Sequence, residues 1–231
     1  MAAEFSGAKL KVNEVAQNDK NPHVPSFESD DKKVSLIQTN AIAYYLANDQ
    51  LRGASLEDRA AVLQWLEYGS CEVESAVASW VYPALGLVES TQQNVQRAKT
   101  DLKQVFSCIN DYLKTRTYLV GERLSLADIA LAADLLLAYE HVADEQFRKA
   151  YDNTNRWYST VVNQPQFKKV LPDVKMCAKA VEFDAGKKVA GAAAAHPAKP
   201  KEEKKPKEEK KPKEEPKPKP KQEEPADEED D

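Results

Sequence analysis

The sequence predicts an α+β to mostly α fold, in which a small β-containing lobe precedes a larger helical lobe and a charged tail. Three observations support this prediction. Alternating apolar residues are confined to residues 8–37, helical periodicity dominates from residue 55, and a Lys/Glu/Pro-rich run begins near residue 186. The two periods differ because side chains alternate between the faces of a strand but return every 3.6 residues on a helix. We therefore divide the chain into residues 1–50, 55–185 and 186–231.

The first part contains three stretches with the pattern of short strands. Ala8–Val12 alternates apolar and basic residues, as a half-buried strand does. Val24–Phe27 and Lys33–Ile37 flank residues 28–31, whose Glu-Ser-Asp-Asp sequence is typical of a turn. This pair predicts a hairpin. Thr39 is then predicted to cap a helix.

The clearest helical periodicity lies between residues 95 and 113, where apolar residues recur at the spacing of one helix face. They are Val95, Ala98, Leu102, Val105, Phe106, Ile109 and Leu113. Before it, Ser55–Asp58 resembles a capping box at the start of another helix. After it, helices are predicted over Asn155–Asn163, from Gln164 onward and over Asp173–Phe183.

The stretch Leu126–Leu137 is almost wholly apolar or small, so the helix that it predicts lies at the centre of a core. Ser125 is a good N-cap, and Asp128 stands at the third helical position, from which its carboxylate can reach the Ser125 amide. We interpret Ser125 and Asp128 as a structural capping box. In the alternative, Asp128 is a charged functional group, for which a carboxylate bound to backbone amides is poorly placed.

Composition argues against several classes of protein. Cys71, Cys108 and Cys177 lie far apart and there are three His, which disfavours a disulfide framework or a zinc site and predicts a reducing, intracellular compartment. Cys71 and Cys108 fall in helical patterns, so we expect them to be buried. We expect no signal peptide and no membrane-spanning segment. The net charge is −5, and the tail from Lys199 carries 11 Lys against 13 Asp and Glu, so direct nucleic-acid binding is not predicted.

The tail repeats a short charged unit. Residues 199–204 and 205–210 both read Lys-Pro-Lys-Glu-Glu-Lys, and residues 211–216 nearly repeat it. The regular prolines prevent a continuous helix, and there is almost nothing apolar to bury. We predict a disordered linker over 186–231; the alternative is a docking site for a charged partner.

Taken together, the small β lobe, the Val-Pro pair, the helix start near Asn40 and the Ser-x-x-Asp central helix resemble the glutathione transferase fold. This fold has a thioredoxin-like N-terminal lobe and an all-helical C-terminal lobe. More specific stretches resemble the gamma subunits of translation elongation factor 1, and the Lys/Glu/Pro tail is also typical of them. These stretches are Gln38–Tyr45, Leu51–Gly53, Tyr112–Ile129, Asn153–Trp157 and Asn163–Phe167.

The resemblance implies that the thioredoxin-like lobe over residues 1–50 is incomplete. Members of the fold begin with a strand and a helix before the segment that matches Ala2–Val12, so we expect the first strand and most of the first helix to be absent and one sheet edge to be unpaired. The family's large C-terminal domain is likewise expected to be missing beyond the linker.

The function that the resemblance implies is that of a non-catalytic, cytoplasmic scaffold. The gamma subunit anchors the subunit that exchanges guanine nucleotide on the tRNA-carrying GTPase, which it therefore serves indirectly. Two alternatives stay open: a glutathione-dependent transferase or thiol reductase, and a docking domain from an aminoacyl-tRNA synthetase with a synthetase partner. Whether the body forms a homodimer is also left open.

The resemblance further implies the positions of a vestigial glutathione site. The backbone of Val24, before a cis-Pro25, would pair with the peptide, and Gln38 and Thr39 with the helix-start amides would bind the γ-glutamyl carboxylate. Without the family, Pro25 is a turn proline and Thr39 a helix cap. The hydroxyl or thiol that activates glutathione belongs to the missing first strand, so we predict no catalytic residue, no metal and no cofactor, with glutathione as the one candidate ligand.

Overall fold

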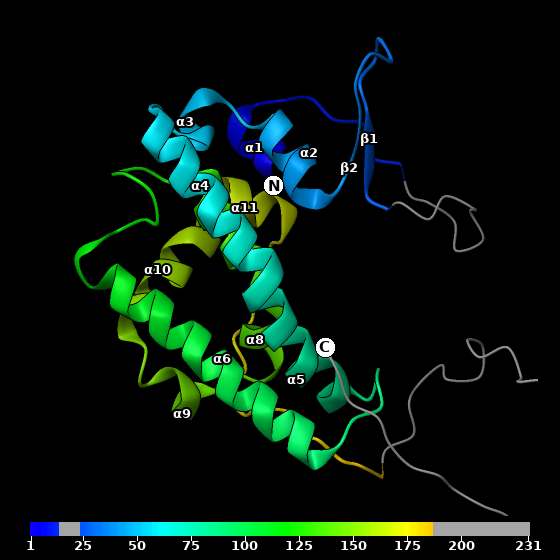
Figure 1. Cartoon of the computed structure of the whole chain (residues 1–231), viewed down its shortest axis with the longest axis vertical. Helices are drawn as coiled ribbons and strands as arrows, with labels where there is room; N and C mark the ends of the chain where they lie inside the picture. Colours follow the sequence, from blue (N-terminus) through cyan, green and yellow to red (C-terminus); the bar gives the residue numbers. More distant parts are fainter. Residues whose placement is uncertain (14–23, 187–231) are drawn as a thin grey trace, which may run out of the picture. The chain divides into compact units, whose positions relative to one another are not determined.

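Helices make up most of the structure in the computed structural model, which describes residues 1–13 and 24–186 (Figure 1). These residues belong to one unit of the chain, Met1–Ala192. In chain order the elements are α1 (Ala2–Ser6), β1 (Ser26–Glu28), β2 (Ser35–Ile37), α2 (Thr39–Leu46), α3 (Asp49–Arg52), α4 (Leu56–Tyr68), the π-helix η1 (Gly69–Val73), α5 (Glu74–Leu85), α6 (Gln92–Tyr112), the 3₁₀ turn η2 (Leu113–Thr115), α7 (Leu126–Asp134), α8 (Leu136–His141), α9 (Glu145–Arg148), α10 (Asp152–Val162) and α11 (Pro165–Val170).

The predicted hairpin is confirmed. β1 and β2 pair antiparallel with Ser26 opposite Ile37 and Phe27 opposite Leu36. The hairpin stands beside α2 (Figure 1), and the Phe27 ring lies 5.4 Å from the ring of Tyr45 on that helix. Phe27 and Leu36 are nevertheless only half-buried, so this part of the molecule has little core of its own.

The predicted strand over Ala8–Val12 is wrong. The segment has no strand partner, because β1 and β2 pair only with each other among the described residues. Leu10 is 45% exposed and Val12 is 83% exposed, so the alternating pattern finds no surface to cover. A strand needs both a ladder partner and a face to bury, and this segment has neither.

The helical lobe is built around a long bent rod, α4–η1–α5, against which α6 runs (Figure 1). Both predicted helix starts are present: Ser55 and Asp58 form a reciprocal capping box at α4, and Ser125 and Asp128 form one at α7. All seven periodic apolar residues of the region 95–113 are buried. The region Leu126–Leu137 forms α7 and the start of α8, with most of its side chains in the core.

The helix predicted over Asp173–Phe183 is absent. This segment runs extended along the helical lobe, and the amides of Cys177 and Val181 donate to the carbonyls of Tyr139 and His141, each at 2.8 Å. Its partly buried apolar residues (Val174, Met176, Val181 and Phe183) pack on the core. Because this backbone finds partners at the end of α8, it gains nothing from closing helical turns of its own.

The burial expected for Cys71 and Cys108 is also wrong, since both side chains are exposed. Cys71 lies in the π-helix, where the extra residue per turn shifts the helix faces, and Cys108 lies between the buried positions of α6. The predicted linker lies outside the described residues from 187 onward.

Candidate functional site

The hairpin register brings together the four positions assigned to a vestigial glutathione site. Ser26 pairs with Ile37, so Pro25 and Gln38 are the next residues outward, just beyond the end of the ladder. The Val24–Pro25 peptide bond is cis. Val24, Pro25, Gln38 and Thr39 are all exposed, so this end of the hairpin is open to a ligand.

The start of α2 differs from the prediction by one residue. Gln38, rather than Thr39, is the N-cap, and no side chain caps the helix. Gln38 has φ 75° and ψ 127°, a conformation that costs a non-glycine residue of order 1–3 kcal/mol. The first amides of α2 therefore have no side-chain acceptor and no acidic residue in the first turn beside them. Such a helix start suits a carboxylate group.

Asn40 ties this helix start to the π-helix, a role that its sequence position did not indicate. Its Nδ2 donates to the Leu66 carbonyl at 3.2 Å and to the Ser70 hydroxyl at 2.8 Å. A π-helix displaces the regular i to i+4 bonding pattern, so carbonyls near it need other donors. The two lobes are therefore joined at this point by a side-chain amide.

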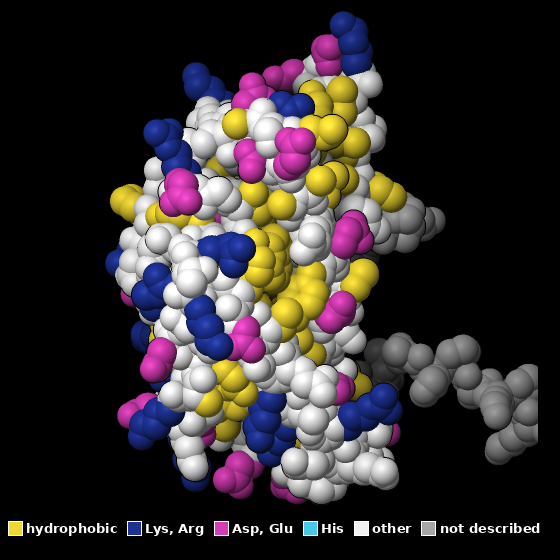
Figure 2. All heavy atoms as spheres, turned by 60° about the vertical axis from the view of Figure 1, so that its left-hand side comes forward, with side chains coloured by type: hydrophobic (Ala, Val, Ile, Leu, Met, Phe, Trp, Pro, Cys, Tyr) yellow, Lys and Arg dark blue, Asp and Glu magenta, His cyan; other side chains and the backbone are white. Residues whose placement is uncertain are grey.

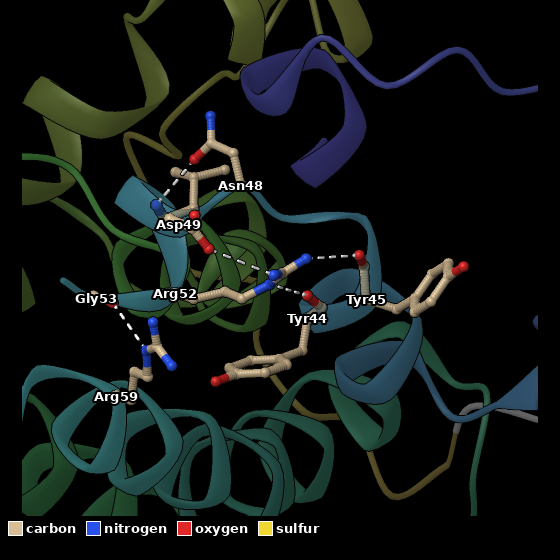
Figure 3. A network of polar contacts seen from close by, with 8 residues as sticks. Tyr44, Tyr45, Asn48, Asp49, Arg52, Gly53 and Arg59 are labelled. Carbon is tan, nitrogen blue, oxygen red and sulfur yellow. Dashed lines mark hydrogen bonds and ion pairs between the residues drawn. The ribbon is translucent and has the colours of Figure 1, made fainter. Parts of the chain in front are cut away.

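Arg52, at the end of α3, ties the segment that links the two lobes back to α2 (Figure 3). Its guanidinium donates to the carbonyls of Tyr44 at 2.9 Å and Tyr45 at 3.0 Å, which are the last turn of α2. A cation at a helix C-terminus is favourable because the carbonyls there lack intrahelical partners. Beside it, Arg59 donates to the carbonyl of Gly53 at 3.1 Å.

Gly53 makes this junction tight. Its φ of 101° is open to glycine, and a Cβ at this position would lie 2.6 Å from the Cβ of Asp58. The turn from α3 into the capping box of α4 therefore requires a residue without a side chain. In the stretch Leu51–Gly53, Leu51 is buried, Arg52 bonds to the end of α2 and Gly53 allows the turn into α4.

The buried carboxylate of Asp128 is a structural centre. Oδ1 accepts from the Leu119 amide at 2.9 Å and from the Trp157 indole at 2.8 Å, and Oδ2 accepts from the Ser125 amide and hydroxyl, both at 2.8 Å. Burial raises the pKa of Asp128, while the four donors favour its ionised form. All its lone pairs point at protein donors, so the group is closed to a ligand.

A second carboxyl group, the partly buried Asp134, lies against Gly69 of the π-helix. Burial, followed by the nearby charge of Glu74, raises the pKa of Asp134 from 3.8 to about 7. A Cβ on Gly69 would overlap an oxygen of this carboxyl group, so a side chain at this position would force the Asp134 carboxyl group to turn away. Nothing in the sequence pattern indicated this contact.

A groove follows the line between α5 and α6. It has two connected sections of about 540 and 400 Å³, which share Ser79 and Asp101. Tyr82, 38% exposed, lines one end, and the exposed thiols of Cys71 and Cys108 line the other. Figure 2 shows one face of the molecule, on which hydrophobic side chains form a band flanked by charged ones.

Residues 1–13 and 24–186 contain no group of three or more His, Cys, Asp or Glu side chains arranged to hold a metal ion. Within the same residues, no helix combines the length and the apolar character needed to cross a membrane.

Comparison with known proteins relates this geometry to a family. Residues 45–165 match the model of the glutathione S-transferase C-terminal domain. Elongation factor 1-gamma of Artemia salina is 44% identical over 98% of this chain and 56% of its own length. The human elongation factor 1-gamma is 40% identical over 81% of this chain and 46% of its own length. The chain thus spans about half the length of these relatives.

Solved structures agree on the fold. The GST-like domain of elongation factor 1-gamma from Saccharomyces cerevisiae superposes with a TM-score of 0.64 at 24% identity, covering 70% of this chain and 78% of that one. A delta-class glutathione transferase from Nilaparvata lugens gives 0.60 at 23% identity, covering 73% and 84%. The expected transferase-like fold is therefore confirmed. The chain belongs to the glutathione S-transferase C-terminal domain family, and its relatives within that family include elongation factor 1-gamma chains.

Proposed function

We propose that this chain is a non-catalytic scaffold of the translation elongation factor 1 complex. In this role its transferase-like domain binds the subunit that exchanges guanine nucleotide and, through it, serves the tRNA-carrying GTPase in the cytoplasm. The observation that carries the proposal is the 44% identity to an elongation factor 1-gamma over nearly the whole chain.

The distribution of packing supports a binding role for the helical lobe. Its central carboxylate, Asp128, is saturated by protein donors and so is unavailable for chemistry. Its surface offers a long groove between α5 and α6, with an exposed aromatic anchor, Tyr82, at one end. Exposed tyrosines beside grooves are common anchors of protein interfaces.

A binding measurement tests the proposal. We expect the full 231-residue chain to bind the N-terminal domain of the exchange subunit in isothermal titration calorimetry, with the same affinity in the presence and absence of glutathione. Binding of a synthetase in place of the exchange subunit, or of neither protein, would contradict the proposal. Turnover of a chloronitrobenzene electrophile with glutathione at ordinary enzymatic rates would contradict its non-catalytic part.

A second candidate function, glutathione binding without turnover, is favoured by the open hairpin end. Pro25 and Gln38 lie just beyond the last pair of the ladder, Ser26 and Ile37, and the uncapped α2 start offers amides for a carboxylate. Retention on glutathione resin that is lost on adding free glutathione would support it. A Gln38→Pro substitution, which cannot adopt the positive φ, is expected to abolish that retention.

A further inference from the structure

A small polar cleft lies where α1, α3, α11 and the loop after η2 meet, four segments that are far apart in the sequence. Its volume is about 210 Å³. Three apolar side chains and four carboxamide side chains line it. The carboxamides are those of Asn48, Gln50, Gln164 and Gln166. None of the lining residues is ionisable. Gln164 and Gln166 belong to the start of α11, where Gln164 is the N-cap.

Three of the four carboxamides are held in place by the backbone. Asn48 Oδ1 accepts from the Leu51 amide at 3.0 Å, Gln50 Nε2 donates to the Leu124 carbonyl at 3.2 Å, and Gln164 Nε2 donates to the Thr160 carbonyl at 3.0 Å. Each bond uses one end of an amide and fixes the direction of the other end. The cleft is therefore preorganised, which lowers the entropy cost of binding.

The unused ends supply both donors and acceptors. Asn48 Nδ2 is a donor, and Gln50 Oε1 and Gln164 Oε1 are acceptors. Among the described residues, Gln166 makes no hydrogen bond at either end of its amide. A peptide group carries one N–H donor and one carbonyl acceptor, so this set matches the main chain of an extended segment. A charged group would find no counter-ion among the lining residues.

We propose that this cleft binds an extended, uncharged peptide segment of the exchange subunit, recognised mainly through its main chain. The inference rests on the proposed function, because the segment comes from the proposed partner. The cleft is smaller than the roughly 300–1,000 Å³ typical of cofactor sites, so it takes a short stretch of chain and not a whole small molecule. The apolar residues beside the amides would contact one side chain of that stretch.

The test uses Gln166, which is exposed and makes no hydrogen bond within the described structure. Gln166→Glu keeps the shape of the side chain but removes a donor and adds a charge to a neutral cleft. We expect it to weaken binding of the exchange subunit to the full chain at least tenfold, and Gln166→Ala to weaken it three- to tenfold. Gln64→Glu, the same change at an exposed position of α4 away from the cleft and the α5–α6 groove, is the control and is expected to change binding less than twofold.

The outcomes separate this inference from the proposed function. If the wild-type chain does not bind the exchange subunit, the proposed function fails. If the wild type binds and Gln166→Glu binds equally well, the cleft is not the contact and only this inference is overturned. A photo-crosslinking residue at position 166 locates the contact on the partner. Capture of a segment without charged residues supports the inference, and capture of a charged helix contradicts it.

Discussion

The helical lobe and the hairpin lobe, which consists of β1, β2 and α2, are stabilised to very different degrees. In the helical lobe, Trp157, Phe106 and Leu131 are completely buried, and the central carboxylate of Asp128 has four donors. In the hairpin lobe each strand has three residues, and α2 contains no buried residue. A two-stranded hairpin is marginal on its own in water. The hairpin lobe therefore depends on its contacts with the helices for its order.

Those contacts are both apolar and polar. Ala43 and Tyr44 of α2 pack against the core cluster that the helical lobe forms. Asn40 bonds to the π-helix region, and Arg52 bonds to the end of α2. Since α2 has no buried residue, we expect the hairpin lobe to open locally at a lower free energy than the helical lobe. The helical lobe is therefore expected to be the rigid part of the molecule, and the hairpin the adjustable one.

The largest effect is expected at the buried capping box. Asp128→Ala leaves the Trp157 indole and the Leu119 and Ser125 amides without an acceptor, so we expect a loss of about 3–5 kcal/mol in the free energy of unfolding. Urea denaturation followed by tryptophan fluorescence measures it. Asp58→Ala, in the exposed box of α4, is the matched control and is expected to cost about 1 kcal/mol. Equal losses in the two variants would refute the central role of Asp128.

Replacing one leucine in each lobe by alanine should change stability by different amounts. Leu131 is wholly buried in α7, and Leu36 is half-buried in β2. We expect Leu131→Ala to cost about 2–4 kcal/mol of global stability and Leu36→Ala less than about 1 kcal/mol. Hydrogen exchange should show faster exchange near β2 alone in the second variant. A global loss from Leu36→Ala would mean that the hairpin is part of the same cooperative unit.

The same difference explains what the sequence could predict. Local periodicity located α6 and the capping of α7, because a helix that buries one stripe must repeat its apolar residues at 3.6-residue intervals. The hairpin was also predictable, since its turn chemistry is local. Ala8–Val12 failed because its pattern fits a strand but pairing depends on a distant partner. Asp173–Phe183 failed because its amides bond to the end of α8.

The contacts of the candidate site residues are likewise either local in the sequence, and predictable, or long-range, and not predictable. Ser125 and Asp128 are three residues apart, so their contact follows from helix geometry. The bonds from Leu119 and Trp157 to Asp128 depend on how a loop and a separate helix pack on α7, and the approach of Asp134 to Gly69 depends on how η1 packs on it. The π-helix, which exposes Cys71, leaves no local signal in the sequence. Long-range contacts of this kind become visible only once the helices are placed.

A third, smaller effect concerns pH. The pKa of Asp134 is about 7 in the folded chain, against an ordinary value of 3.8. Between pH 4 and 7 the folded state therefore holds a proton that the unfolded state has lost, so the stability contributed by this group falls as pH rises through that window. Asp134→Asn should flatten this dependence and gain about 1–2 kcal/mol at pH 8.

Urea denaturation at pH 5, 6.5 and 8 measures the dependence. Asp111→Asn, in an exposed carboxylate paired with Lys114, is the control and should leave the profile unchanged. A wild-type stability that rises with pH over this window, and is not altered by Asp134→Asn, would show that this carboxyl group is ionised in the folded state. In that case η1 packs against a charged carboxylate on α7 and not against a neutral carboxyl group.

The smallest effect is expected at the ion pair between α1 and α11. Lys169 Nζ lies 2.6 Å from Glu4 Oε2, but the two side chains are 69% and 37% exposed. Water screens exposed charges and both side chains lose rotamer freedom, so we expect Lys169→Ala to cost less than about 0.5 kcal/mol of global stability. At high salt, where the ion pair is screened, the wild type and Lys169→Ala should have the same free energy of unfolding. A loss above about 1 kcal/mol would mean that this ion pair is a main contact holding α1 against α11.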